Sequence, residues 1–121
     1  MPGGNETVLV AEDSADIRQM ALEQLESLGY RTIAAVDGEQ ALSILRGADK
    51  VDLLFTDIVM SGRLSGYDLA SIARKSRPDL GILLTSGYAE SKQGDVAMKF
   101  LRKPYRKQEL AVALRAVLDR R

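Results

Sequence analysis

Short apolar runs, separated by longer segments of mixed polarity, recur along the chain. The runs at residues 7–11, 51–56 and 81–86 lack period-two alternation and end at polar side chains. A run of this kind is typical of a strand that is buried on both faces of a parallel sheet. Residues 30–35 and 100–102 form weaker runs, so we expect five strands in total.

The segments between these runs carry apolar residues at helical spacing. Ser14 is suited to cap the first helix and Gly29 to end it. Further helices are predicted at residues 37–46, 67–76 and 107–120. Residues 90–99 stay ambiguous, because Gly94 interrupts a segment that could form only a short helix.

Strands that alternate with helices indicate right-handed βαβ units, and hence a parallel sheet with helices on both faces. We therefore predict an α/β fold, a single flavodoxin-like (βα)5 doubly wound domain with the sheet order 2-1-3-4-5. A length of 121 residues suits one domain. Residues 7–121 are expected to form this domain. Residues 1–6 are expected to be a flexible lead-in, which lacks the basic and apolar regions of a signal peptide.

Polar side chains stand at the ends of four predicted strands. Glu12 and Asp13 follow the first strand, Asp57 follows the third, Thr85 lies near the end of the fourth, and Lys103 follows the fifth. The carboxyl ends of parallel strands meet at one edge of the sheet, where open α/β sheets bind their ligands. Each residue has an ordinary alternative: a charge at a helix N-terminus, a hydroxyl bonded to backbone, or a solvated lysine. Their joint placement favours a shared site.

Clustered carboxylates repel one another, and a bound cation or a raised pKa relieves the repulsion. Oxygen ligands without His or Cys nearby favour a hard ion such as Mg²⁺. A carboxylate beside Mg²⁺, a lysine and a hydroxyl is suited to phosphoryl transfer onto the carboxylate itself. We therefore expect Asp57 to accept a phosphoryl group, whose oxygens Lys103 and Thr85 contact.

The composition excludes several other functions. The chain contains no His and no Cys, which removes Ser-His triads, His-ligated metals, disulfides and thiolate zinc sites. Its 17 basic residues balance 17 acidic residues, so no global basic field argues for nucleic acid binding. No apolar run approaches the roughly 20 residues of a membrane span. We expect a cytoplasmic domain that neither binds nucleic acid directly nor inserts into a membrane.

Five motifs carry a close resemblance to the receiver domain of two-component response regulators. They are VLVAED at residues 8–13, DIVM at 57–60, GYDL at 66–69, TSG at 85–87 and KPY at 103–105. Each motif is weak alone, but together they are highly specific, and the resemblance extends over residues 7–120. It implies a phosphoacceptor in a two-component phosphorelay, a switch module rather than a free-standing enzyme.

The resemblance also implies roles for the residues at the sheet edge. Asp57 is the phosphoacceptor, and Asp13 and Asp57 are Mg²⁺ ligands. Glu12 acts on the metal through water, and the backbone carbonyl of Val59 is a further metal ligand. The phosphoryl donor is a phosphohistidine, on a sensor histidine kinase or a histidine phosphotransfer protein.

The remaining implied roles concern the phosphoryl group and the conformational switch. Thr85 and Lys103 contact the phosphoryl group, and Phe100 occupies the position of the switch aromatic residue. The peptide bond between Lys103 and Pro104 is expected to be cis, which X-Pro bonds tolerate. The domain is expected to be a monomer or a weak dimer.

Three departures from the family pattern matter. Ser61 stands where the family usually has proline, in a loop that is one residue longer. Phe100 has no hydroxyl, so it can switch only through ring packing. Only fourteen residues separate Thr85 from Phe100, which shortens the fourth helix and argues against dimerisation through it. The chain looks most like the carboxyl-terminal receiver of a hybrid sensor kinase, with a single-domain regulator as the near alternative.

Functions of other classes are less compatible with the residues present. An aspartyl-phosphate hydrolase of the haloacid dehalogenase type needs a second acid two residues after the nucleophile, where this chain has Val59. A flavodoxin relative binds phosphate at the end of the first strand, where Glu12 and Asp13 would repel it. No G-x-G-x-x-G follows any predicted strand, which disfavours a nicotinamide site.

Overall fold

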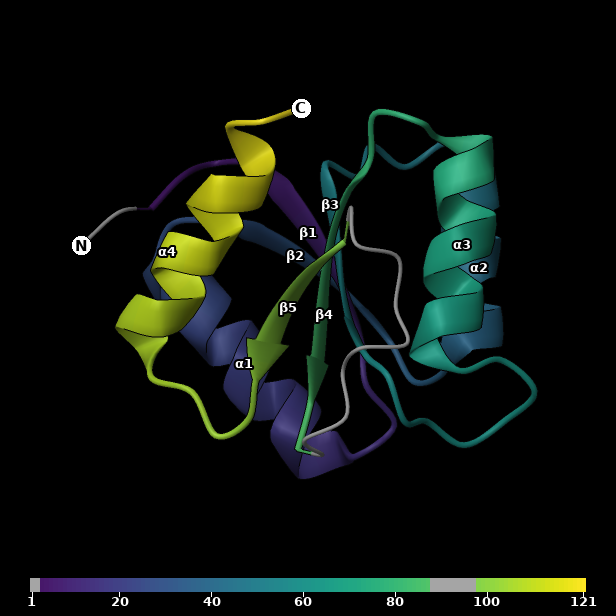
Figure 1. The fold of residues 1–121 in the computed structure, drawn as a ribbon, viewed down its shortest axis with the longest axis horizontal. Helices are drawn as coiled ribbons and strands as arrows, with labels where there is room; N and C mark the ends of the chain where they lie inside the picture. The colour runs from purple at the N-terminus through teal and green to yellow at the C-terminus, as the bar shows by residue number, and fades with distance from the viewer. Residues whose placement is uncertain (1–2, 88–97) are drawn as a thin grey trace.

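A five-stranded parallel sheet lies between two layers of helices in the computed structural model, which describes residues 3–87 and 98–121 (Figure 1). The strands are β1 (Thr7–Ala11), β2 (Arg31–Ala35), β3 (Leu53–Asp57), β4 (Gly81–Ser86) and β5 (Lys99–Arg102). The helices of the described residues are α1 (Ala15–Ser27), α2 (Gly38–Arg46), α3 (Gly66–Ser76) and α4 (Lys107–Leu118). Most of the ambiguous segment at residues 90–99 lies outside the described residues.

The sheet has the order β2-β1-β3-β4-β5, and every neighbouring pair is parallel. This confirms the predicted flavodoxin-like, doubly wound α/β fold. The sheet reverses its winding between β1 and β3, whose carboxyl ends therefore lie side by side. That pair of strand ends is the place where a fold of this type binds its ligands.

Helices cover both faces of the sheet, with α1 and α4 on one face and α2 and α3 on the other (Figure 1). Successive side chains of a strand project to opposite faces of the sheet, so each strand contributes to the core on both faces. Phe55 and Leu83 pack with residues of α1 and α4. Leu54 packs with residues of α2 and α3, and Leu84 lies in a third cluster that includes Ala70 of α3.

Three of the predicted strands have other bounds in the structure. The fifth strand begins at Lys99 rather than at residue 100, since its ladder with β4 starts at Lys99. The second strand begins at Arg31 rather than at residue 30, because the N–H of Tyr30 donates to the carbonyl of Leu25 and so closes the end of α1 (3.1 Å). The third strand begins at Leu53 and includes Asp57 as its last residue, since its ladder with β4 extends to Asp57.

The helix boundaries follow local capping. The hydroxyl of Ser14 accepts a hydrogen bond from the N–H of Ile17, which confirms Ser14 as the cap of α1. The last helix ends at Leu118 rather than at residue 120, and Asp119 is its C-cap. None of the helices in the described part of the chain is long and apolar enough to cross a membrane.

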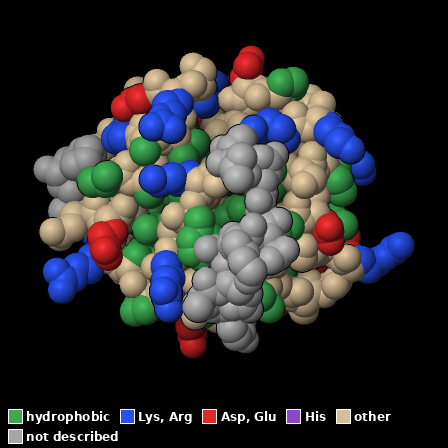
Figure 2. All heavy atoms as spheres, in the orientation of Figure 1, with side chains coloured by type: hydrophobic (Ala, Val, Ile, Leu, Met, Phe, Trp, Pro, Cys, Tyr) green, Lys and Arg blue, Asp and Glu red, His purple; other side chains and the backbone are tan. Residues whose placement is uncertain are grey.

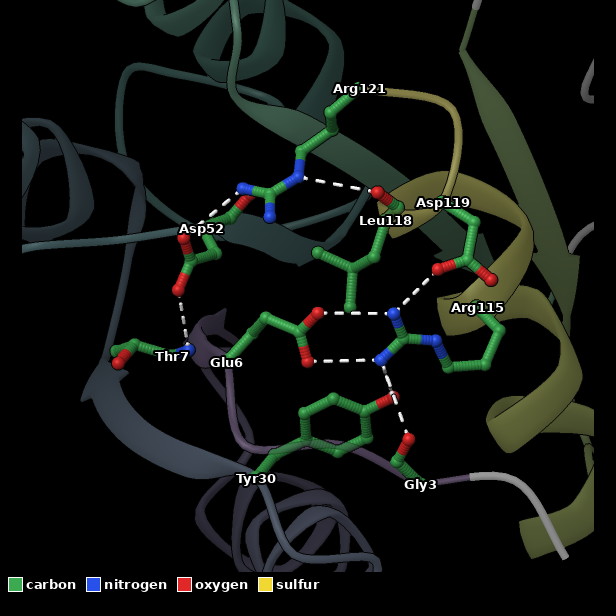
Figure 3. Close-up of polar contacts among 9 residues, drawn as sticks. All are labelled: Gly3, Glu6, Thr7, Tyr30, Asp52, Arg115, Leu118, Asp119 and Arg121. Carbon is green, nitrogen blue, oxygen red and sulfur yellow. Dashed lines mark hydrogen bonds and ion pairs between the residues drawn. The ribbon is translucent and has the colours of Figure 1, made fainter.

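A polar cluster joins the start of the chain to the end of α4, at the amino-terminal edge of the sheet (Figure 3). The guanidinium of Arg115 donates to both carboxylate oxygens of Glu6, at 2.9 and 3.1 Å. It also contacts Asp119 at 2.6 Å, the hydroxyl of Tyr30 at 3.4 Å and the carbonyl of Gly3 at 3.3 Å. These contacts favour an anchored Glu6, while the flexibility expected of residues 1–6 stays a prediction.

A second arginine holds the start of β3 in the same region. Arg121 donates to the carboxylate of Asp52 at 3.1 Å, and the other oxygen of that carboxylate accepts from the N–H of Thr7 at 2.9 Å (Figure 3). The two arginines therefore tie α4 to the first residues of β1 and β3.

Over the face of the molecule in Figure 2, Lys and Arg side chains lie scattered among acidic and apolar ones.

Replacing Glu6 by Gln should destabilise the protein by about 1 kcal/mol at neutral pH, because a partly buried, bidentate ion pair is lost. The hydrogen bond from Arg115 lowers the pKa of Glu6 below its ordinary 4.5. The stabilisation is therefore present above pH 4.5 and is lost as the pH falls through the lowered pKa. Urea unfolding should show a difference between the two proteins that disappears in acid.

Asp49→Asn is the matched control, since Asp49 is an exposed carboxylate with no side-chain partner within the described residues. It should unfold as the wild type does at every pH. A deficit of Glu6→Gln that persists in acid would contradict an ionic role for Glu6.

Candidate phosphorylation site

Three carboxylates meet at the carboxyl ends of β1 and β3. Glu12 and Asp13 follow β1 directly, and Asp57 ends β3. One oxygen from each carboxylate lies within 4.8 Å of the other two. The structure thus brings together the three acids that the sequence placed at neighbouring strand ends.

Lys103 reaches the same place from the end of β5. Its Nζ lies 3.3 Å from Oε1 of Glu12 and 3.4 Å from Oδ2 of Asp57. The Lys103 N–H donates to the carbonyl of Ser86 at 2.9 Å, which holds the start of this loop against β4. The peptide bond from Lys103 to Pro104 is cis, as the resemblance implied.

Two of the carboxylates are buried, and their surroundings shift their pKa values. The side chains of Glu12 and Asp57 are only 6% and 11% exposed. Burial raises the pKa of Asp57, and the charge of Lys103 opposes the rise without cancelling it. Burial also raises the pKa of Glu12, and the nearby charge of Asp57 adds to the rise. An added positive charge nearby would therefore stabilise the ionised form of both carboxylates.

Asp13 differs from the other two acids. Its side chain is exposed, and its Oδ2 accepts a hydrogen bond from the backbone N–H of Ser61 at 2.8 Å. That N–H lowers the pKa of Asp13, so this carboxylate stays charged more readily than its neighbours. Sequence reasoning noted Ser61 only as a substitute for proline, and no pattern signals that its backbone N–H meets a carboxylate.

Thr85 offers a buried hydroxyl beside the acids. It pairs with Asp57 in the parallel ladder and is 3% exposed. Its Oγ1 has no hydrogen-bond partner among the described residues. Thr85 and Asp57 line a cavity of about 10 Å³ together with Lys103, which is room for about one water molecule. A buried hydroxyl without a partner is costly, so it favours a ligand that accepts a hydrogen bond here.

Tyr105 lines the same cavity and received no role from the sequence. Its ring packs edge-on against Phe55, with the ring centroids 6.1 Å apart. Burial, together with the charges of Glu12 and Asp57, raises the pKa of Tyr105 to about 12. The phenol therefore stays protonated beside the acids.

Phe100 lies on the other side of the sheet from Thr85. The ladder pairs Phe100 with Leu84, and both pack into a cluster with Ile58 and Ile82. Thr85 follows Leu84 and so projects to the opposite face, toward the cavity beside Asp57. The two proposed switch residues are close in register, but their side chains are separated by the β4 backbone.

The loop after β3 is held tightly by α3. The N–H of Gly66 donates to the carbonyl of Ile58 at 2.7 Å, and a Cβ on Gly66 would overlap the carbonyl oxygen of Asp57. Glycine is required here because the two backbone segments touch. Val59 lies in this loop, two residues after Asp57, and 53% of the residue's surface is exposed.

Comparison with known proteins agrees with this geometry. The family model described as the response regulator receiver domain matches residues 8–115. The chain belongs to this family. It is a phosphoacceptor receiver domain of two-component systems, as the sequence predicted, and the comparisons give no support to a haloacid dehalogenase hydrolase.

Similar proteins include a hybrid kinase. The chain is 32% identical over 123 residues to the sensor kinase CckA of Brucella abortus (strain 2308). The aligned part covers 97% of this chain and 13% of the kinase. The transcriptional regulatory protein CpxR of Escherichia coli (strain K12) is 33% identical to this chain, which spans 49% of its length. The chain spans about half the length, or less, of further regulators that are 29 to 32% identical to it.

Solved structures confirm the fold. The response regulator TrrA from Thermotoga maritima, in complex with Mg²⁺–BeF, superposes with a TM-score of 0.83 at 30% identity, covering 93% of this chain and 99% of TrrA. The receiver domain of the hybrid histidine kinase CckA superposes with a TM-score of 0.79 at 32% identity, covering 93% of this chain and 98% of that one.

The cluster of Glu12, Asp13 and Asp57 fits a hard divalent cation. All donors are carboxylate oxygens, and they lie close enough to share one ion. Two of the three carboxylates, Glu12 and Asp57, are buried and share the ammonium of Lys103. A cation would offset the cost of burying these charges, which raises the pKa values of Glu12 and Asp57.

Replacing Gly66 by Ala should destabilise the receiver by about 1 to 3 kcal/mol, because the added methyl group would push the end of β3 away from α3. Helix propensity alone predicts the opposite sign, since alanine is the better helix former. Chemical denaturation of the variant measures the change.

Gly87→Ala is the control, because a Cβ at Gly87 meets nothing within 4 Å among the residues at 3–87 and 98–121. Its stability should stay close to that of the wild type. A Gly66→Ala protein as stable as the wild type would show that the contact with the Asp57 backbone is not tight.

Proposed function

We propose that Asp57 is the phosphoacceptor of this receiver and that Asp13, Asp57 and the carbonyl of Val59 bind Mg²⁺, with Glu12 acting on the metal through water. The observation that carries the proposal is the set of groups around one carboxylate. Asp57 has two acids within 4.8 Å, an ammonium at 3.4 Å and, in the neighbouring ladder position, a hydroxyl that has no partner among the described residues. The bound Mg²⁺ would supply positive charge to the carboxylates and to the phosphoryl oxygens.

The protein groups then divide the chemistry between them. A carboxylate oxygen of Asp57 attacks the phosphorus of a phosphohistidine, the P–N bond breaks, and its electron pair stays on the imidazole. Lys103, already 3.4 Å from Asp57, neutralises charge on the transferred group. The hydroxyl of Thr85 donates a hydrogen bond to one phosphoryl oxygen, which gives that buried group a partner.

The donor must come from another domain or another protein, because this chain contains no histidine. We propose a sensor histidine kinase or a histidine phosphotransfer protein, with this chain acting as the receiver of a hybrid kinase. The similarity to CckA supports the hybrid arrangement. A single-domain regulator is the alternative, and the reading frame upstream of Met1 would decide between them.

Further properties belong to the same proposal. The domain acts as a switch and not as a free-standing enzyme, in the cytoplasm, where kinases find ATP. Its balanced charge supports a domain that does not bind nucleic acid directly. We propose a monomer or weak dimer.

The switch is proposed to run through β4. When Thr85 turns toward the phosphoryl group, the strand shifts at its carboxyl end. Leu84, on the opposite face, is the ladder partner of Phe100. The Phe100 ring then repacks within the cluster of Ile58 and Ile82. A phosphoryl group shifts this equilibrium only as far as it binds the two states differently.

Acetyl phosphate with Mg²⁺ should add one phosphoryl group to the wild-type protein, and Asp57→Asn should gain none. Intact-protein mass spectrometry measures the product, and chelation of Mg²⁺ should abolish it. Asp49→Asn, which removes an exposed carboxylate, should be phosphorylated like the wild type. Equal labelling of Asp57→Asn and wild type would refute the assignment.

Thr85→Ala should uncouple Phe100 from the site, because it removes the hydroxyl that would donate to the phosphoryl group. NMR of the Phe100 ring with and without beryllofluoride reports the coupling. The ring should respond in the wild type and in Thr85→Ser, which keeps the hydroxyl, but not in Thr85→Ala. An equal response in all three proteins would place the coupling elsewhere.

A further inference from the structure

The loop after β3 contacts the acidic cluster through a backbone group. The N–H of Ser61 donates to Oδ2 of Asp13 at 2.8 Å, although the two residues lie 48 positions apart in the chain. Asp13 is the one exposed acid of the cluster. An exposed carboxylate beside two other carboxylates would otherwise rotate toward solvent, because like charges repel.

The same loop is fixed at a second point. The N–H of Arg63 donates to Oε2 of Glu39, in the first turn of α2, at 3.0 Å. Gly62 lies between the two donors with φ of +96°, a conformation that glycine adopts without strain. A Cβ on Gly62 would lie 3.0 Å from the Glu39 carboxylate. The loop therefore presents the N–H groups of Ser61 and Arg63 to two different acids.

We propose that Ser61 is a positioning residue for the metal site: its backbone N–H holds Asp13 in the orientation that a divalent cation needs. The Ser61 hydrogen bond occupies one carboxylate oxygen and leaves the other for the ion. A charge-assisted hydrogen bond of this length is strong enough to fix the carboxylate. Partners of metal ligands orient them in this way, and losing such a partner weakens metal binding.

The backbone N–H is assigned this role, because it makes the 2.8 Å hydrogen bond and is the largest cause of the lowered pKa of Asp13, to which the Ser61 hydroxyl contributes less. Proline at this position would have no N–H and could not hold Asp13. Ser61 has a negative φ, because within the described residues only glycines have a positive one. A proline can therefore be introduced here with a φ of the sign it requires. The inference rests on the proposed function, in which Mg²⁺ is the ion.

Ser61→Pro and Ser61→Ala form a matched pair, since only the first removes the N–H. Calorimetric titration with Mg²⁺ should give an affinity roughly tenfold or more below the wild type for Ser61→Pro. Ser61→Ala keeps the N–H and loses only the hydroxyl, so its affinity should stay close to that of the wild type. Equal affinity of the proline variant, or tighter binding by it, would overturn the role. A wild type that binds no Mg²⁺ would instead overturn the proposed function.

A second measurement does not depend on whether the proline variant folds. In the ¹H–¹⁵N spectrum of the wild type, the Ser61 amide proton should be shifted downfield by its hydrogen bond. It should move upfield in Asp13→Ala, while the Arg63 amide, bonded to Glu39, stays in place. On addition of Mg²⁺ to the wild type, the Ser61 amide should keep its downfield shift. An upfield movement would show that the hydrogen bond competes with the metal, which contradicts the proposal.

Discussion

The ammonium of Lys103, placed between the carboxylates of Glu12 and Asp57, is the interaction on which the site depends. It lies 3.3 and 3.4 Å from them, in a region where both acids are almost fully buried. An unpaired buried charge is strongly destabilising, so Lys103 allows the two acids to stay at the sheet edge. One ammonium cannot neutralise three carboxylates, however. The remaining negative charge makes the cluster a receptor for a divalent cation, and then for a phosphoryl group.

The two edges of the sheet have opposite electrostatic characters. At the amino-terminal edge, Glu6 and Asp52 each have an arginine partner and backbone donors, and the pKa values of both are lowered. At the carboxyl edge, the pKa values of Glu12 and Asp57 are raised, and the hydroxyl of Thr85 has no partner in the part of the chain that the structure describes. The first edge stabilises the fold. The second edge keeps interactions unsatisfied until a ligand arrives, which is typical of a functional site.

The sequence predicted the strand order and the meeting of Glu12, Asp13, Asp57 and Lys103, because uninterrupted apolar runs and the parallel topology determine both. It could not predict that Ser61 binds Asp13, since a backbone N–H is the same in nearly every residue and its direction depends on the loop.

The relation of Thr85 to Phe100 also needed the register. The spacing of the two residues along the chain does not show on which face of the sheet each side chain lies. The pairing of Phe100 with Leu84 puts the β4 backbone between the Phe100 ring and the Thr85 side chain. The predicted start of the second strand at Tyr30 was wrong because the N–H of Tyr30 bonds to a carbonyl of α1, which the sequence pattern does not show.

A crystal structure of the receiver with Mg²⁺ and beryllofluoride tests the central claim most directly. We predict beryllofluoride on a carboxylate oxygen of Asp57, with Oγ1 of Thr85 and Nζ of Lys103 within hydrogen-bond distance of its fluorines and a carboxylate oxygen of Asp13 on the metal. Beryllofluoride on another side chain, or a Thr85 hydroxyl that still lacks a partner in the complex, would contradict the account.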